Sequence, residues 1–297
     1  MKKPGLFLLI GLLAAAMSAA CNKESAAGEG GSAKAPSAVE SAPGAEAPAS
    51  KDAPAAASNS SANKPGTGTI TGHVRLVGKA PGNPVIRMGM DPKCSQENSG
   101  KKVAQELVVA NENGDLANVF VSLKGKFPKT PVSDEPVIID QQKCVFVPRV
   151  SGARVGQTLE IHSSDNAAHN SHGQTLRGNS FNLMQPTPET ISKFVLKDEE
   201  VMLRITCDLH SWMFTYVGVV DHPYFAVTGT DGAFQIRNVP PGTYSIEIWH
   251  ERYGPVTKSV TVTADKPVTV DFEYTGKEEP PHRASIDEIV VPAKSKS

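Results

Sequence analysis

Hydrophobic and polar positions alternate along much of the chain between residues 66 and 276. Val119, Val121 and Leu123 take every second position of one stretch, and residues 268–274 repeat the pattern. A period of two places successive side chains on opposite faces of a strand, so each stretch predicts a strand with one buried face. Glycine- and proline-rich turns separate these stretches, and no helical period extends beyond two turns. The sequence therefore predicts an all-β fold, either a sandwich or a barrel.

The N-terminus has the form of an export signal. Two lysines precede an apolar run over residues 6–20, which is too short and too rich in small side chains to span a bilayer. The run ends in MSAAC, which resembles the lipobox of bacterial lipoproteins, although a serine stands where that pattern usually has leucine. The resemblance implies that residues 1–21 are a lipoprotein signal and that Cys21 carries lipid. Ordinary cleavage near Ala20, with a free Cys21, is the alternative.

The composition changes after this signal. Residues 22–65 are almost entirely Ala, Ser, Gly, Pro, Lys and Glu, and we expect a disordered linker because such a segment buries too little apolar surface to fold. Residues 277–297 are expected to form a loose tail. Asn22 stands in place of the aspartate that retains many lipoproteins at the inner membrane. We therefore expect a lipid-anchored protein of the cell envelope, on the periplasmic face of the outer membrane or at the cell surface.

The charge of the chain argues against one class of partner. The formal net charge is −1 at pH 7, and the sequence has no basic stripe with interleaved aromatic residues. Binding to nucleic acid is therefore not expected.

The four cysteines of an exported chain are first considered as disulfide partners. Once Cys21 is assigned to lipid, three remain. Cys94 and Cys144 each lie beside a turn or a strand start, and a disulfide between them would stabilise the fold by about 4 kcal/mol. Alternation in VMLRITCDLH places Cys207 on the apolar face at the end of a strand. Cys207 is then unpaired, and it is either an inert buried side chain or a ligand.

The heptapeptide CDLHSWM, residues 207–213, favours a ligand. It brings a thiol, an imidazole and a thioether into one loop. With a second imidazole, these groups suit an ion that cycles between Cu(I) and Cu(II). A histidine from another strand would fix the geometry, and His169 in SSDNAAHNSHG follows the predicted strand QTLEIHSS.

Residues 137–221 resemble a cupredoxin, the family of plastocyanin, azurin and amicyanin. VFVPRVSGARVGQTLEIHSSDNAAHNSHG resembles the opening strands of the family, and CDLHSWM matches the short amicyanin-type ligand loop. The resemblance implies one type 1 copper site that transfers single electrons, with no enzyme activity. It implies four copper ligands, namely His169, Cys207, His210 and Met213.

The resemblance also assigns roles to neighbouring residues. Asn170 would brace the cysteine loop through hydrogen bonds. His210 would lie at the surface and pass electrons to a partner, within an apolar patch for which Trp212, Met213 and Phe214 are candidates. Trp212 packing inward is the alternative.

Two of the ligand assignments have alternatives. His172 lies in the same loop as His169 and could replace it as a ligand, although the following Asn170 and the distance to Cys207 favour His169. If both bound, one cysteine and three histidines would make a tetrahedral zinc site. Met213 argues against zinc, because a thioether suits copper. Met213 packing in the core is the other interpretation. We expect the remaining histidines to be structural or exposed, and they are His73, His162, His222, His250 and His282.

The segments on both sides of the copper domain have a different character. TDGAFQIRNVPPGTYSIEI resembles part of a carboxypeptidase-regulatory-like domain, a transthyretin-like sandwich grouped with carbohydrate-binding-like folds, and GTITGHVRLVGKAPG resembles the first strand of that domain. We expect residues 66–136 and 222–276 to form one sandwich into which residues 137–221 are inserted, because each piece alone has too few strands. Three consecutive small units are the alternative, and strand pairing between the outer segments distinguishes the two.

These features predict a membrane-anchored type 1 copper protein that exchanges electrons with a redox protein of the cell envelope. The alternative is a binding module that holds copper or zinc and recognises a glycan or an envelope protein. The intact CxxHxxM loop favours the electron carrier, whereas the second sandwich fits either function.

Overall fold

The computed structural model describes residue 64 and residues 66–278 of the chain. The expectations for the signal and the lipidated Cys21 fall on residues outside this part, and so do those for the linker and the loose tail except at residues 64, 277 and 278. Within the described part, no helix has the length and apolar character needed to cross a membrane.

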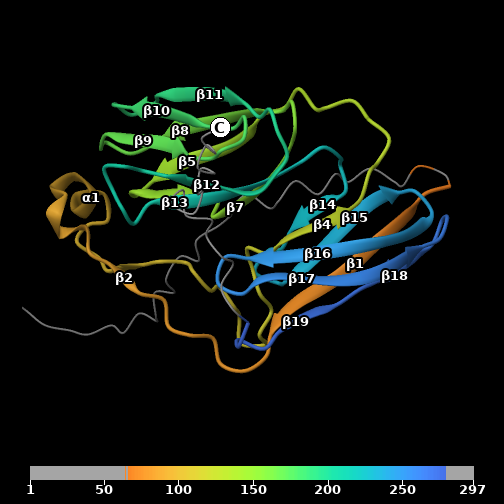
Figure 1. Cartoon of the computed structure of the whole chain (residues 1–297). Helices are drawn as coiled ribbons and strands as arrows, with labels where there is room; N and C mark the ends of the chain where they lie inside the picture. The colour runs from red at the N-terminus through yellow and green to blue at the C-terminus, as the bar shows by residue number, and fades with distance from the viewer. Residues whose placement is uncertain (1–63, 65, 279–297) are drawn as a thin grey trace, which may run out of the picture. The chain divides into compact units, whose positions relative to one another are not determined.

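The predicted all-β fold class is confirmed, and its central part is a sandwich of two open sheets (Figure 1). One sheet has the order β10 (Phe181–Gln185), β9 (His169–Gly173), β12 (Glu200–Thr206), β13 (Phe214–Val220) and β7 (Val150–Arg154). The other sheet has the order β11 (Ile191–Val195), β8 (Thr158–Ser163), β5 (Val137–Gln142) and β6 (Val145–Val147). Two strand pairs are parallel, β7 with β13 and β5 with β8, and the others are antiparallel.

The alternation of the sequence forms the core of this central sandwich. Leu159 and Ile161 of β8 are fully buried and pack in the same cluster as Leu203 and Ile205 of β12. Burying side chains of this size stabilises the fold by about 1.5–3 kcal/mol each. Cys207 belongs to the same cluster, so the alternation placed it correctly.

A second sandwich is built from both outer segments. One sheet contains β1 (Gly68–Leu76), β15 (Ala233–Val239), β18 (Pro267–Thr269) and β19 (Phe272–Tyr274). The other has the order β14 (Phe225–Val227), β4 (Phe120–Lys124), β16 (Gly242–His250) and β17 (Gly254–Val262). Figure 1 shows the orange strand β1 among blue strands, because β1 pairs with β15, β18 and β19.

The pairings connect the beginning of the folded chain with its end. Ile70 lies opposite Ile236 in the β1–β15 pair, and Val121 lies opposite Ile248 in the β4–β16 pair. This is the pairing between the outer segments that an inserted central sandwich requires.

The segment between β1 and β4 differs from the expectation that residues 66–136 belong to the outer sandwich. It contains β2 (Val85–Ile86), η1 (Met88–Met90), α1 (Pro92–Glu97) and β3 (Val103–Ala104). Ile86, Met88 and Cys94 pack in the core of the central sandwich. The physical reason is covalent, because a disulfide joins Cys94 of α1 to Cys144 between β5 and β6.

Close backbone approach marks the junction between the two sandwiches. Gly152 of β7 lies opposite Gly218 of β13, and a Cβ atom on either glycine would lie within 2.5 Å of a phenylalanine ring. Phe225 and Phe120 are those rings, and both belong to the outer sandwich. Only glycine leaves room for this packing.

Candidate metal centre

The predicted ligands gather at one end of the central sandwich. His169 is the first residue of β9, Cys207 directly follows β12, and His210 and Met213 lie in the loop before β13. Two backbone hydrogen bonds close this loop, from the N–H of Cys207 to the carbonyl of Met213 at 3.1 Å and from the N–H of Met213 to the carbonyl of His210 at 2.8 Å. The loop therefore holds its side chains in a compact turn.

Three donor atoms converge on one buried point. The Nδ1 atoms of His169 and His210 are 3.0 Å apart, and the Sγ of Cys207 lies 3.7 Å from the Nδ1 of His210. The three side chains offer ligand atoms within 4.8 Å of one another, and the residues are at most 4% exposed. One ion with bonds of about 2.0–2.3 Å fits such a spacing, and a thiolate with two imidazoles suits copper or zinc.

The structure separates the two candidate histidines of the β9 region. His172 lies outside the three-residue cluster, and its Nδ1 is 3.0 Å from the carboxylate of Asp208. His169, and not His172, therefore lies beside Cys207. Met213 is buried in the same hydrophobic cluster as Cys207, and its role as an axial ligand stays a prediction.

Asn170 has the bracing contacts that the resemblance implied. Its side-chain oxygen accepts a hydrogen bond of 2.6 Å from the N–H of Asp208, and its side-chain nitrogen donates to the Asp208 carboxylate at 2.7 Å. These bonds tie the residue after Cys207 to the strand that carries His169.

Sequence reasoning missed two carboxylates that contact the predicted ligands. Asp165 lies 3.0 Å from the Nε2 of His169, and Asp91 lies 2.9 Å from the Nε2 of His210. Asp165 precedes His169 by four positions in SSDNAAH, whereas Asp91 comes from a distant segment before α1. Only Asp165 had a local signal in the sequence, because Asp91 reaches the site through tertiary packing.

The neighbours of the Cys207 thiol favour its ionised form. Burial disfavours the thiolate, but hydrogen bonds with His169 and His210 lower the pKa of Cys207 to about 6. Burial also opposes the charge of His169, and hydrogen bonds with Asp165 and Cys207 raise its pKa to about 9. The hydrogen bond to Cys207 is the main cause of the raised pKa of His210. A thiolate is the form of cysteine that binds metal.

His210 does not lie at the surface as the resemblance implied. It is 4% exposed, because α1 covers it and the disulfide holds α1 in place. Trp212 packs against it with 4.9 Å between ring centroids and donates from Nε1 to the carbonyl of Cys144. Met213 is buried as well. The expected apolar surface patch around an exposed His210 is therefore wrong for this chain.

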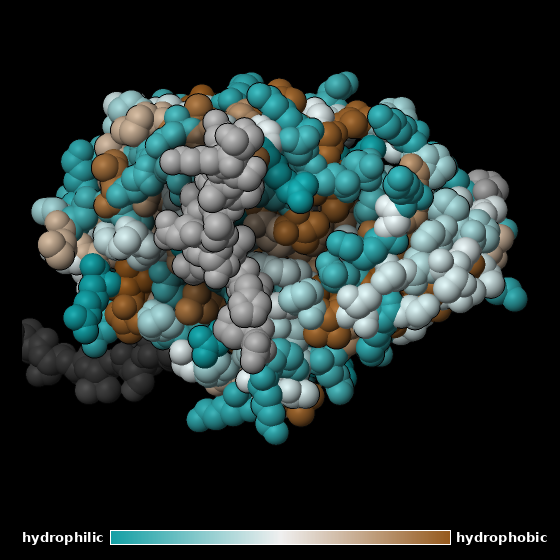
Figure 2. All heavy atoms as spheres, in the orientation of Figure 1, coloured by the Kyte–Doolittle hydropathy of each residue, from teal (hydrophilic) through white to brown (hydrophobic). Residues whose placement is uncertain are grey.

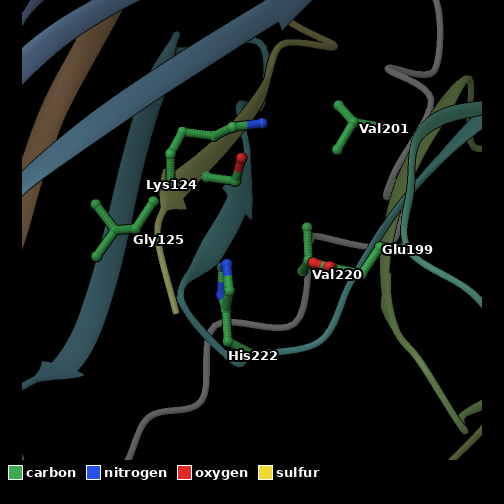
Figure 3. A pocket seen from close by; sticks show the side chains of 8 residues that line it. Lys124, Gly125, Glu199, Val201, Val220 and His222 are labelled. Carbon is green, nitrogen blue, oxygen red and sulfur yellow. The ribbon is translucent and has the colours of Figure 1, made fainter. Parts of the chain in front are cut away.

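A separate cavity of about 210 Å³ lies away from this centre. Figure 3 shows Lys124 and His222 on one side of it and Glu199 on the other. These polar groups have partners in the protein: Lys124 pairs with Glu247, His222 accepts from the N–H of Tyr224, and Glu199 accepts from the N–H of Asp221. The cavity is therefore not a candidate for the predicted copper site.

Comparison with family models supports the predicted regulatory-like domain. Residues 217–275 match the family model of the carboxypeptidase regulatory-like domain. A search of curated proteins finds no match. Solved structures with some similarity include a purple cupredoxin from Nitrosopumilus maritimus, with 19% identity over 28% of this chain and 98% of that chain and a TM-score of 0.25.

Two further solved structures are similar to about a third of the chain. A mutant of amicyanin in its Cu(I) form has 19% identity over 33% of this chain and 97% of its own, with a TM-score of 0.26. A Cu-containing nitrite reductase from Thermus scotoductus has 16% identity over 32% of this chain and 24% of its own, with a TM-score of 0.26.

Proposed function

We propose that the chain is a type 1 copper protein that carries single electrons in the cell envelope and catalyses no reaction of its own. The observation that carries this proposal is the convergence of His169, Cys207 and His210 on one buried point, with Met213 in the same loop. One thiolate, two imidazoles and a weak thioether are the donor set of blue-copper electron-transfer sites.

The residues of the site would keep the geometry of the ligands nearly the same whether the bound copper is Cu(I) or Cu(II). Copper bound by these residues would supply the exchange between Cu(I) and Cu(II). The backbone bonds of the 207–213 loop and the bracing by Asn170 restrain the ligands in one geometry. Burial of Cys207 and His169 excludes water from the donor atoms. Little reorganisation would then oppose the electron.

We propose that the redox partner contacts the surface beside the covered His210. Leu209 of the ligand loop is 56% exposed, and Met90, next to Asp91, is 96% exposed. These two residues flank the Asp91–His210 contact along the chain. Figure 2 shows that hydrophobic residues on the face in view form small groups between hydrophilic ones. A lipid anchor at Cys21 would keep the carrier at the membrane.

A second candidate function is a binding module whose metal site is structural or stores copper or zinc. The cover over His210 favours this alternative, because a closed ligand shell is typical of structural sites. The regulatory-like sandwich would then recognise a glycan or an envelope protein.

Voltammetry of the copper-loaded protein separates the two functions. A carrier should give one reversible one-electron wave with copper bound at one equivalent, and it should exchange electrons with a small soluble redox mediator. Asn170→Ala should weaken copper binding by loosening the loop, whereas Asn113→Ala, at an exposed turn far from the loop in the sequence, is the control. A protein that retains zinc in preference to copper, or that shows no reversible wave, contradicts the carrier and supports the binding module.

A further inference from the structure

A carboxylate contacts the Nε2 atom of each histidine that we propose as a copper ligand, on the side of the ring away from the other ligands. The Nε2 of His169 lies 3.0 Å from Asp165, and the Nε2 of His210 lies 2.9 Å from Asp91. In both rings, Nδ1 is the atom that faces the other ligands. An imidazole that binds metal through Nδ1 carries its proton on Nε2, and a carboxylate is a suitable acceptor for that proton.

The two carboxylates are connected to each other through the disulfide. The N–H of Cys94 donates to Asp91 Oδ1 at 2.9 Å, and the N–H of Cys144 donates to Asp165 Oδ2 at 2.7 Å. Cys94 and Cys144 are bonded to each other and are fully buried. The Sγ of Cys94 also lies 3.7 Å from the Nε2 of His210. A continuous set of contacts therefore runs from one histidine to the other.

We propose that Asp91, Cys94, Cys144 and Asp165 form a frame that positions both ligand histidines and tunes the bound ion. The disulfide fixes the distance between the two carboxylates, and each carboxylate fixes the rotation of one imidazole. The ligand atoms are thus arranged before the ion arrives, which increases affinity. This inference rests on the proposed function only in placing a metal ion among His169, Cys207 and His210.

The frame also predicts how the reduction potential of bound copper changes when a carboxylate is removed. A carboxylate that accepts from Nε2 makes Nδ1 a stronger donor. A stronger donor stabilises Cu(II) more than Cu(I), because the attraction grows with the charge of the ion. Loss of either carboxylate should therefore raise the reduction potential.

Asp91→Ser is the most informative variant, because Asp91 has two roles. Its Oδ1 caps the N-terminus of α1, and serine is also a favoured N-cap, so α1 is retained. A serine hydroxyl is too short to replace the contact of Oδ2 with His210. Glu97→Gln is the matched control, since it removes one negative charge from the same helix and keeps an oxygen that accepts from the N–H of Asn166.

The test measures zinc and Cu(II) affinity of the full chain by competition with a chelator, and the potential of the copper form by voltammetry. Asp91→Ser should bind each ion about 10–100-fold more weakly than the wild type and have a higher potential. Glu97→Gln should stay within about twofold, because solvent screens its charge. Equal behaviour of the two variants overturns the frame.

A second measurement keeps the inference testable where the copper site itself is in question. In the zinc-loaded wild type, ¹⁵N-edited proton spectra should show the Nε2–H of His210 far downfield and protected from exchange with water. Asp91→Ser should lose this signal, and the double variant Cys94→Ser with Cys144→Ser should weaken zinc binding as well.

Zinc binding that depends on Asp91, without a copper chromophore, would refute the electron carrier and leave the frame intact. A blue copper protein that is indifferent to Asp91 would refute the frame alone, and a wild type that binds neither ion would refute both.

Discussion

At the scale of single residues, the ligand loop was the most predictable part of the site. Cys207, His210 and Met213 lie within seven positions, and a loop this short leaves their side chains little freedom to separate. His169 was predicted from the resemblance and the preceding strand, and the structure places it next to Cys207. Asp91 was not predictable, because its contact with His210 spans 119 positions of sequence and depends on the packing of α1.

Met213 gives a prediction that separates a ligand from a core side chain. Met213→Leu keeps the volume and the burial but removes the thioether, which is the weak axial donor of a blue-copper site. Because the axial donor favours Cu(II), we expect a higher reduction potential and a retained absorption band. Voltammetry of the copper form measures the change.

Met184→Leu is the matched control for this substitution, because Met184 is exposed on β10. Its potential should equal that of the wild type. An unchanged potential in Met213→Leu would assign Met213 to packing alone.

At the scale of elements, alternation predicted strands well and predicted the helix poorly. β8 buries every second residue as its sequence suggests, and β12 does so at Leu203 and Ile205, although Val201 is 39% exposed before the register shift of that strand. α1 has only six residues, too few for a helical period to be visible in the sequence. It is stabilised instead by the Asp91 cap and by the disulfide to Cys144, which are tertiary features.

The end of β16 gives a prediction about pH. Burial lowers the pKa of His250 to about 3, and its ring packs against Tyr253 and Tyr274. The unfolded chain binds a proton here below its ordinary pKa of about 6.5, whereas the folded chain does not until about pH 3. Between these values His250 therefore destabilises the fold as pH falls, by up to about 1.4 kcal/mol for each pH unit.

Urea unfolding of His250→Gln between pH 7 and pH 4 measures this contribution. Glutamine does not titrate, and its side-chain oxygen can accept from the N–H of Arg252 as the Nδ1 of His250 does. The variant should lose less stability on acidification than the wild type. If the stabilities of the variant and the wild type fall in parallel, His250 takes up its proton over the same pH range in the folded and the unfolded chain, which contradicts the prediction.

At the scale of the whole described chain, the insertion of one sandwich into the other was predictable from the strand count of each segment. The residues that join the sandwiches were not. Arg149 and Glu251 form two hydrogen bonds of 2.7 Å, and both side chains are at most 8% exposed. Arg149 also lies 3.8 Å above the ring of Phe214, next to Met213. This pair could not be predicted from the sequence, because Arg149 and Glu251 come together only when both sandwiches are folded.

Breaking this ion pair should destabilise the protein strongly. Arg149→Ala leaves the carboxylate of Glu251 buried without its partner, which costs about 3–5 kcal/mol. Replacing both partners, as Arg149→Met with Glu251→Leu, should recover much of the loss because no buried charge remains. Free energies of unfolding from urea titration give both values.

The exposed pair of Lys124 and Glu247 serves as the control for this cycle. Lys124→Ala should cost no more than about 1 kcal/mol, because water screens the pair. A similarly small cost for Arg149→Ala would mean that the junction does not depend on the buried pair.

The central claim is that Cys207 binds copper as a thiolate between two imidazoles, and a visible absorption spectrum tests it most directly. The chain from Gly66 onward is loaded with one equivalent of Cu(II) and compared with Cys207→Ser, which keeps the size of the side chain. The account predicts an intense blue or purple thiolate-to-copper band in the wild type and its loss in the variant. A wild type without this band, or a band that survives in Cys207→Ser, would contradict the account.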